Sequence, residues 1–246
     1  MNAVERQRKI QELLAAKEFI SVENLSRMLN VSLATIRRDL TAMENDRILT
    51  RYRGGAVLSP KSFEKALHIE ERMDENREQK EIIAKCAAEK IQDGEYIYID
   101  SSSTTYFMID YISANDITVV TNAVLLIPDL MRHHIRTFVL GGFVDESCNC
   151  IMGEMANSQI KNMNFSKAFI GTYAIEENRG LTTYDIGEGD IKKLILSHTN
   201  EAYVLADHTK FKKKGFIVYA ALDQATIITD SEPMNANSYP SLIIAG

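Results

Sequence analysis

Five consecutive hydroxyl side chains follow one of the apolar runs of the sequence, and together they could bind an anion. The run 96–99 ends at Asp100, and the residues after it are Ser101, Ser102, Ser103, Thr104 and Thr105. Apolar residues of a predicted helix come next, so the hydroxyls lie between a strand and a helix. Backbone N–H groups at a helix start, with hydroxyls beside them, suit a phosphate group. Because an ordinary helix cap needs only one such residue, we favour a phosphate site over a simple cap.

Small or polar residues follow five further apolar runs, which are 117–120, 137–140, 168–170, 202–206 and 226–228. The residues after these runs include Asn122, Gly141, Gly142, Gly171, Asp207, Lys210 and Asp230. Short apolar runs between helical patterns are typical of buried, mostly parallel strands in an α/β sheet. Such sheets bind ligands at the carboxyl ends of their strands. Each position alone is a weak signal because turns are polar, but six in succession predict one ligand-binding edge.

Charged side chains in a predicted helix over 187–199 could complete this site. Glu188 and Lys192 are four residues apart and share one helix face. The alternative is a solvent-exposed ion pair, which this spacing also produces. Lys210 follows Asp207 just after a strand and could reach an anion, whereas we expect the lysines at 212–214 to be solvated loop charges.

The first 58 residues predict a different unit, made of three short helices. Ser21 is placed to cap the second helix and Ser32 the third, after a turn of about four residues. Leu33, Ile36, Leu40 and Met43 recur at helical spacing and predict one buried stripe on the third helix. The opposite face of that helix holds Ala34, Thr35, Arg37, Arg38 and Thr41.

This arrangement predicts a helix-turn-helix whose third helix enters the major groove of DNA. Arginine matches the paired acceptors of guanine, so Arg37 and Arg38 are the predicted base-reading residues. Two short strands after the helix would form a wing that places Arg51 and Arg53 against phosphates. The alternative is a three-helix bundle with an ordinary solvated basic face.

Composition separates the two parts of the 246-residue chain. The net charge is −6, yet residues 1–58 hold ten bases and seven acids, so they carry +3 and the remainder −9. We interpret 1–58 as a DNA-binding domain, 59–79 as a helical linker and 80–246 as an α/β domain. With three cysteines, no apolar leader and no apolar stretch of membrane-spanning length, we expect a cytoplasmic protein with no membrane partner.

The string 31–40, Val-Ser-Leu-Ala-Thr-Ile-Arg-Arg-Asp-Leu, followed by Arg-Tyr-Arg-Gly-Gly-Ala at 51–56, resembles the DNA-binding signature of the DeoR family of bacterial transcription regulators. The landmarks of the α/β part occur in the order of that family's effector domain, whose fold is similar to ribose-5-phosphate isomerase. The resemblance implies a regulator, usually a repressor of carbohydrate genes, that binds operator DNA and a phosphorylated sugar. It implies that the ligand is surrounded by Asp100, Ser103, Thr104, Asn122, Glu188, Lys192, Asp207 and Lys210. One departure is Ser102, where the family's loop usually has glycine; a serine there narrows the predicted pocket or changes its ligand.

Other chemistry is weakly supported. Cys148 and Cys150, and the pair His133 and His134, have no partners at the spacing of a metal site, so we expect no metal and no cofactor. We predict a non-enzyme that forms homodimers or homotetramers on repeated half-sites. One alternative is an aldose–ketose isomerase using Asp100, Glu188 or Asp207 as base and a lysine as electrophile. Another is a DNA-binding protein whose large domain only oligomerises.

Overall fold

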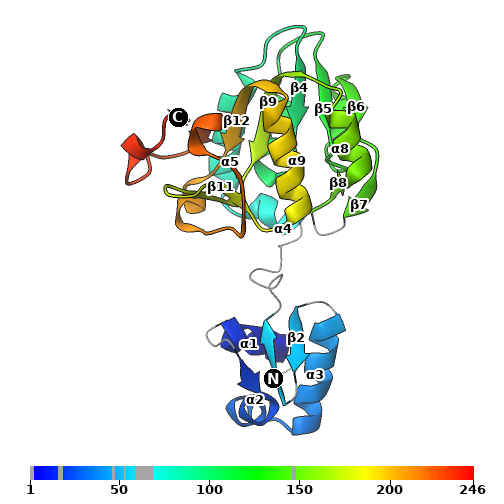
Figure 1. Ribbon diagram of the computed structural model, residues 1–246, viewed down its shortest axis with the longest axis vertical. Helices are drawn as coiled ribbons and strands as arrows, with labels where there is room; N and C mark the ends of the chain where they lie inside the picture. Colours follow the sequence, from blue (N-terminus) through cyan, green and yellow to red (C-terminus); the bar gives the residue numbers. More distant parts are fainter. Residues whose placement is uncertain (1–2, 16–18, 46–47, 53, 59–68, 146–147) are drawn as a thin grey trace. The chain divides into compact units, whose positions relative to one another are not determined.

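The computed structural model describes residues 3–15, 19–45, 48–52, 54–58, 69–145 and 148–246. The chain divides into two compact units, 1–67 and 68–246 (Figure 1). The predicted boundary at 58 falls next to residues 59–68, which lie outside the described ones, so the division into 1–58, 59–79 and 80–246 stays an interpretation.

The first unit contains three helices and a small antiparallel sheet. The helices are α1 (Ala3–Ala15), α2 (Val22–Leu29) and α3 (Leu33–Asn45). The strands β1 (Ile20–Ser21), β2 (Leu49–Tyr52) and β3 (Gly55–Leu58) lie in the order β1-β3-β2. Strands β2 and β3 form the predicted wing, and Gly54 at its tip has φ +84°, a conformation that glycine adopts without strain. The three helices and the wing were therefore predictable from local patterns.

The core of the first unit confirms most of the predicted buried positions. Ile36, Leu40 and Met43 of α3 are fully buried. Leu33 is 40% exposed, so its place in the predicted stripe is wrong. It is the first residue of α3, and a helical Cβ leans toward the N-terminus, which carries this side chain past the end of the packed face. On α2, Leu29 packs against the core and Met28 is exposed.

The second unit is built on a seven-stranded parallel sheet, which confirms the predicted fold class. Its order is β15-β14-β12-β9-β4-β5-β6, and every neighbouring pair is parallel. The strands are β4 (Tyr96–Ile99), β5 (Thr118–Thr121), β6 (Arg136–Val139), β9 (Phe165–Gly171), β12 (Thr199–Leu205), β14 (Thr226–Thr229) and β15 (Leu242–Ile244). Six of them overlap with the six apolar runs, three of which extend one residue beyond the strand, and β15 was not predicted. Strands β9 and β12 begin three residues before their apolar runs. The polar residues Ser166 and Lys167 separate Phe165 from the run in β9, and β12 begins with the polar residues 199–201.

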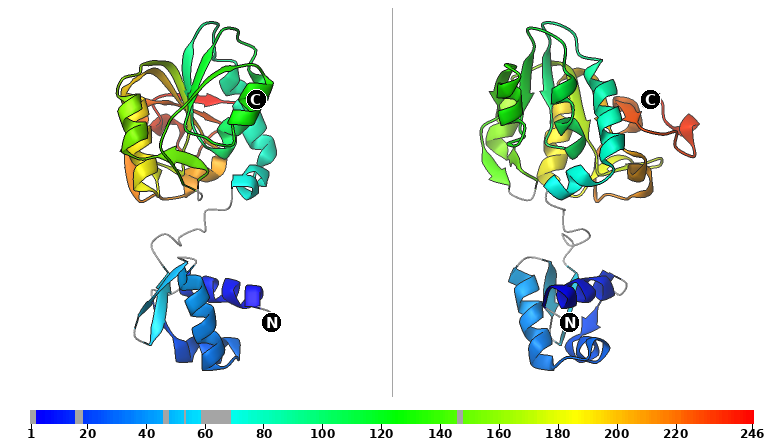
Figure 2. Two further views of the ribbon diagram at one scale, coloured as in Figure 1. Left: turned by 90° about the vertical axis from the view of Figure 1, so that its right-hand side faces the viewer. Right: turned by 180° about the vertical axis from the view of Figure 1, so that it is seen from behind.

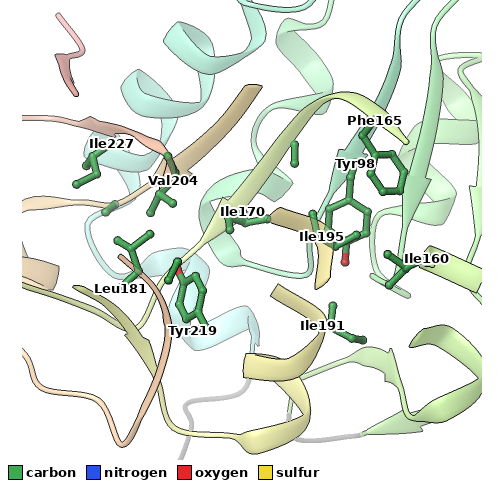
Figure 3. Packing of buried hydrophobic residues seen from close by; sticks show 14 of the residues in the cluster. Tyr98, Ile160, Phe165, Ile170, Leu181, Ile191, Ile195, Val204, Tyr219 and Ile227 are labelled. Atoms are coloured by element: carbon green, nitrogen blue, oxygen red, sulfur yellow. The ribbon is translucent and has the colours of Figure 1, made fainter. Parts of the chain in front are cut away.

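Helices cover both faces of this sheet (Figures 1 and 2). They are α4 (Ile69–Asp74), α5 (Arg77–Ala88), α6 (Ser103–Tyr106), α7 (Ile127–Arg132), α8 (Glu154–Ile160) and α9 (Ile186–Ser197). Strand alternation directs Tyr98 of β4 toward the cluster that contains Ile160 of α8 and Ile195 of α9 (Figure 3). Ile97 and Ile99 belong to the second cluster, formed with α5 and α7. Strand β4 therefore contributes to two cores.

Two smaller β-structures were not predicted. Strands β10 (Ala174–Glu176), β11 (Gly180–Thr183) and β13 (Ile217–Ala220) form an antiparallel sheet. Strands β7 (Phe143–Asp145) and β8 (Cys150–Met152) form a two-stranded ladder. Strand β11 leads into α9 and carries Thr183, so the small sheet positions one side of the polar site described below.

Candidate functional sites

The polar cluster of the second unit lies where the order of the sheet changes direction. From β4 the chain adds β5 and β6 on one side, and then returns to add β9, β12, β14 and β15 on the other. Asp100 follows β4, and Gly171 ends the neighbouring β9. In open α/β sheets, ligands bind in the crevice at this switch point. The fold therefore brings the first predicted site residue to the expected location.

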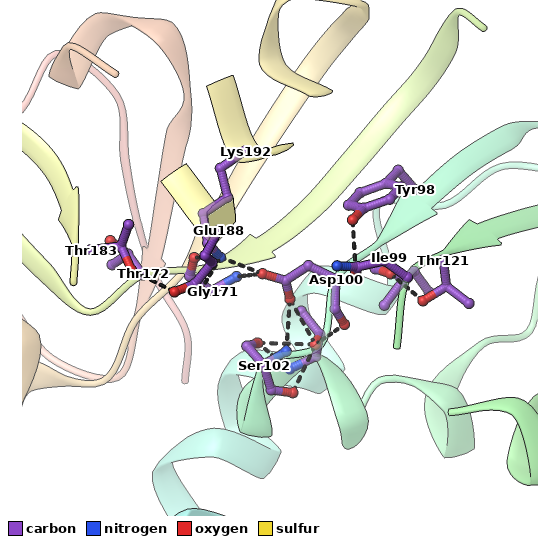
Figure 4. A network of polar contacts seen from close by, with 12 residues as sticks. Tyr98, Ile99, Asp100, Ser102, Thr121, Gly171, Thr172, Thr183, Glu188 and Lys192 are labelled. Carbon is purple, nitrogen blue, oxygen red and sulfur yellow. Dashed lines mark hydrogen bonds and ion pairs between the residues drawn. The ribbon is translucent and has the colours of Figure 1, made fainter. Parts of the chain in front are cut away.

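Asp100 is the centre of this cluster (Figure 4). It is 4% exposed, and its Oδ2 accepts hydrogen bonds from Lys192 Nζ at 2.7 Å and from the Gly171 amide at 2.8 Å. Its Oδ1 accepts from the Ser102 amide and from Thr105 Oγ1, each at 3.0 Å. Burial by itself would raise the pKa of Asp100, but Lys192 and the amide donors hold that pKa below its ordinary value. Asp100 is therefore an ionised, fully bonded carboxylate.

Lys192 links Asp100 to Glu188 from the far side of the crevice. Helix α9 presents both residues, and Asp185 caps it by accepting from the Glu188 amide at 3.0 Å. Lys192 Nζ lies 3.1 Å from Glu188 Oε1 and donates to the Gly171 carbonyl at 2.7 Å. Burial lowers the pKa of Lys192, and the two carboxylates reverse this effect and hold that pKa well above its ordinary value. Lys192 is 3% exposed, so the alternative of a solvent-exposed pair is wrong.

The hydroxyl segment 101–105 serves partly as a cap. Ser102 Oγ accepts from the Thr105 amide at 3.1 Å, which makes Ser102 the N-cap of α6. Thr105 Oγ1 contacts Asp100, and it is completely buried. Ser103 and Thr104 are also buried, whereas Ser101 is half-buried. Two of the five hydroxyls thus shape the segment and hold Asp100, and this leaves Ser101, Ser103 and Thr104 as the remaining candidates for a ligand.

Ser102 and Gly171 occupy adjoining space. A Cβ added to Gly171 would lie 2.3 Å from the Cβ of Ser102. The serine therefore fills the gap between the ends of β4 and β9, and the opposite residue must be glycine. The serine at position 102, where the family's loop usually has glycine, therefore takes up space beside Gly171 that a glycine would leave open.

The remaining predicted ligand residues are less closely grouped. Asn122 accepts from the hydroxyl of Tyr98 at 2.8 Å and donates to the Ile151 carbonyl at 3.3 Å, so it ties β5 to β8. The Gly141 amide donates to Gln159 of α8 at 3.0 Å. A Cβ on Gly142 would lie 2.9 Å from the Met152 carbonyl oxygen, so both glycines permit close packing.

Asp207 lies two residues after β12, the strand next to β9, and it is 1% exposed. It accepts from the Thr209 amide at 3.0 Å and so caps the short helix His208–Lys212 that carries Lys210. The structure thus brings Asp100, Glu188 and Lys192 into contact and leaves Asp207 with Lys210 as a neighbouring group.

Sequence reasoning missed several residues of the site. Thr183 Oγ1 donates to Glu188 Oε2 at 2.5 Å, and the Tyr219 ring lies 5.9 Å from Lys192 Nζ. Lys80 of α5 is 3% exposed. The helical spacing could have indicated Lys80. It lies three residues before Ile83 and four before Ala84, so it shares the apolar face of its helix, where a solvated lysine is not expected. Tyr219 and Thr183 come from the small sheet, and no local pattern indicated them.

In the first unit, α3 presents the predicted DNA-binding face. Ala34, Arg37, Arg38 and Thr41 are exposed, and Thr35 is half-buried. Ser32 Oγ accepts from the Thr35 amide at 3.1 Å, and Ser21 Oγ accepts from the Asn24 amide at 3.2 Å, so both predicted caps are confirmed.

Two further side chains fix the position of α3 and the wing. Asp39, on the inner side of α3, pairs with Arg6 of α1, with Arg6 Nη2 3.0 Å from Asp39 Oδ1. Arg51 of the wing donates to Thr41 at 2.6 Å and lies 3.7 Å from Glu44. Arg51 is therefore held against α3, and Arg53 lies outside the described residues.

A capped helix-turn-helix with a wing, together with an α/β unit that has a polar switch point, defines a DNA-binding regulator with a sensor domain. Residues 6–62 match the DeoR-like helix-turn-helix domain, and residues 75–231 match the DeoR C terminal sensor domain. The chain belongs to the DeoR family of transcription regulators.

Similar proteins are also named as transcriptional regulators or repressors. It is 34% identical to the uncharacterized HTH-type transcriptional regulator FruR of Bacillus subtilis, over 96% of this chain and 94% of that protein. It is 31% identical to the lactose phosphotransferase system repressor of Staphylococcus aureus, over 93% and 92%, and 34% identical to the HTH-type transcriptional regulator GolR of Listeria innocua, over 93% and 91%. These relatives are regulators, so the isomerase alternative is not supported.

Among solved structures, a D-ribose-5-phosphate isomerase in complex with phospho-erythronic acid matches 55% of this chain and 54% of that chain, with 21% identity and a TM-score of 0.42. Likeness at this level bears on neither ligand nor activity. Within the described residues, no helix has the length and apolar character to cross a membrane. The same residues contain no group of three or more His, Cys, Asp or Glu side chains that could hold a metal ion.

Proposed function

We propose that this regulator binds operator DNA through residues 1–58 and that a phosphorylated sugar, bound within residues 80–246, changes this binding. The observation that carries the proposal is the buried cluster of Asp100, Glu188 and Lys192 at the switch point of the sheet. Asp100 and Lys192 have almost no solvent contact, and Glu188 beside them is half-buried. Charged groups in such positions are costly to bury and are typical of a functional site.

On the effector side, the carboxylates and the lysine suit the hydroxyl groups of a sugar, since each offers fixed hydrogen-bonding atoms. The phosphate would be bound by the segment 101–105, with Lys210 supplying positive charge. Asn122 and Asp207 would lie at the sides of the ligand, and Gly141 and Gly142 would form its border. Ser102 reduces the space beside Gly171, which favours a ligand that does not need close backbone approach there.

On the DNA side, we assign base reading to Arg37 and Arg38, with Ala34, Thr35 and Thr41 on the same face. Ser21 and Ser32 hold the helices that present this face. Arg51, and by the same reasoning Arg53, would contact phosphates. A single small unit makes few DNA contacts, so two or four copies of the chain acting on repeated half-sites are proposed.

The sign of regulation and the pathway are also proposed. Relatives over more than nine-tenths of their length include a lactose phosphotransferase system repressor. This supports a repressor of carbohydrate genes that a metabolite releases from DNA.

The experiment has two parts. First, the full chain selects its operator from a random DNA library, and the affinity for that DNA is measured by fluorescence anisotropy at several salt concentrations, because phosphate contacts make it salt-dependent. Second, a thermal-shift screen uses ribose 5-phosphate, fructose 1-phosphate, fructose 6-phosphate and galactose 6-phosphate. A ligand at about 100 times its Kd adds about 2.7 kcal/mol of apparent stability. Selective DNA binding with no response to any phosphorylated sugar would refute the effector proposal and favour a large domain that only oligomerises.

A further inference from the structure

Helix α4 carries an arginine with two buried nitrogens that have no partner. Nε and Nη2 of Arg72 are shielded from solvent and lack a hydrogen-bond partner within the part of the chain that the structure describes. Buried donors without partners are rare in folded proteins, and a missing ion is one explanation. These two nitrogens share one edge of the guanidinium group, and such an edge binds two oxygens of a phosphate side by side. This edge of the guanidinium group therefore has the chemistry of an anion site.

The position of α4 places this arginine beside the hydroxyl segment. Helix α4 packs against α6, which begins at Ser103. Ile69 and Met73 of α4 line a small recess together with Ser101 and Ser102. Arg72 directly precedes Met73, which lines this recess beside the segment 101–105 that is proposed to bind phosphate.

Lys80 connects α4 to α5 at the same place. Its Nζ donates to the carbonyl of Arg72 and to a carbonyl in the turn that follows α4. Burial lowers the pKa of Lys80 to about 8; the negative charge of Asp207 opposes this effect, and the positive charges of Lys210 and Arg72 add to it. Three positively charged side chains therefore gather near the end of β12, with one buried carboxylate among them.

Building on the proposed effector function, we propose that Arg72 binds the phosphate group of the effector through Nε and Nη2, and that α4 is the element that responds to the effector. In the chain, α4 begins directly after residues 59–68, which lead from the DNA-binding unit. A bond made only in the liganded state stabilises one position of α4 over another. Such differential binding is what a ligand needs to shift a conformational equilibrium.

The test compares three full-length proteins: wild type, R72Q and the control R136Q. Arg136 is an exposed arginine of the edge strand β6, so its replacement removes the same charge elsewhere. Affinity for each sugar phosphate of the thermal-shift panel, and for inorganic phosphate, is measured by calorimetry. Hydrogen exchange of the 69–76 amides is followed with and without ligand. Operator affinity is measured at ligand concentrations that saturate each variant.

The expected result is specific to R72Q. Its ligand-free Tm should not fall, because Nε and Nη2 of Arg72 have no hydrogen bond to lose within the described residues. Its affinity for the sugar phosphate should nevertheless fall at least tenfold. Ligand should protect the 69–76 amides in wild type and R136Q but not in R72Q. The ligand-induced change in operator affinity, which is typically about 5- to 150-fold in allosteric proteins, should be largely lost in R72Q alone.

Three results would overturn the proposal. If R72Q binds the sugar phosphate as tightly as wild type, Arg72 does not bind its phosphate. If R72Q at saturating ligand releases DNA as wild type does, α4 is not the responding element. If no sugar phosphate binds wild type, the effector proposal fails as well, which separates that outcome from the first two. If wild type binds inorganic phosphate but no sugar phosphate, the Arg72 edge binds a free anion and the effector proposal is wrong.

Discussion

Replacing Lys192 by methionine should destabilise the second unit strongly, because it leaves the buried carboxylate of Asp100 and the half-buried carboxylate of Glu188 without their shared cation. At an effective dielectric constant of about 20, the Coulomb attraction of Nζ is about 6 kcal/mol for Asp100 at 2.7 Å and about 5 kcal/mol for Glu188 at 3.1 Å. Most of this attraction offsets the cost of removing three charges from water. Breaking such a buried group costs about 3–5 kcal/mol net, and we expect a loss of this size in the free energy of unfolding.

Tyrosine fluorescence during urea denaturation is a suitable assay. The chain has ten tyrosines and no tryptophan, and every tyrosine except Tyr52 lies within residues 68–246, so the signal reports mainly on the second unit. The matched control is K193M, since Lys193 is the exposed neighbour of Lys192 on α9 and its replacement should change stability by less than about 0.5 kcal/mol. A loss below about 1 kcal/mol in K192M would refute the reasoning.

A double variant tests the pairing itself. D100N/K192M removes one carboxylate together with the cation, so its loss should be smaller than the sum of the two single losses by about 0.5–3 kcal/mol. Simple additivity would mean that Asp100 and Lys192 are not coupled, in spite of their 2.7 Å contact.

Three further predictions concern pH, packing and DNA. The stability advantage of wild type over K192M should be largest near neutral pH and should diminish as the pH falls toward about 4. In K192M, burial without the lysine raises the pKa of Asp100, so acid neutralises the unpaired carboxylate; in wild type, the lowered pKa contributes stability that is lost in acid. An advantage that grows in acid would contradict this. G171A should lower the free energy of unfolding by about 1–3 kcal/mol, since its new Cβ meets Ser102, and S102G should relieve much of that loss. Denaturation of the single and double variants measures both effects. If G171A costs the same with Ser102 and with Gly at position 102, the contact is not the cause. R37A and R38A should each weaken operator binding by about 1–3 kcal/mol in anisotropy titrations, while the control R8A on α1 should change it little. If all three variants weaken binding equally, α3 is not the recognition helix.

Local patterns in the sequence determined the elements and much of the class of protein. Apolar periodicity located the helices of the first unit, because residues three and four apart share a helix face whatever surrounds them. Hydroxyl residues before apolar stripes marked the caps at Ser21 and Ser32, because a cap bonds within three residues. The six apolar runs became six neighbouring strands, and their polar ends share one edge because parallel strands point the same way.

Only the tertiary structure decided which polar residues are joined. Asp100 and Lys192 are 92 positions apart, and Gly171 reaches the same carboxylate from a third segment. Spacing along the chain carries no information on such contacts, so an exposed pair of Glu188 with Lys192 was as consistent with the sequence as a buried one. The glycines at 141 and 142 were predicted to lie at the ligand-binding edge, and only the structure shows that they also accommodate α8 and β8, because close backbone approach depends on what packs opposite. The edge of Arg72 that has no partner among the described residues is likewise visible only in the tertiary structure.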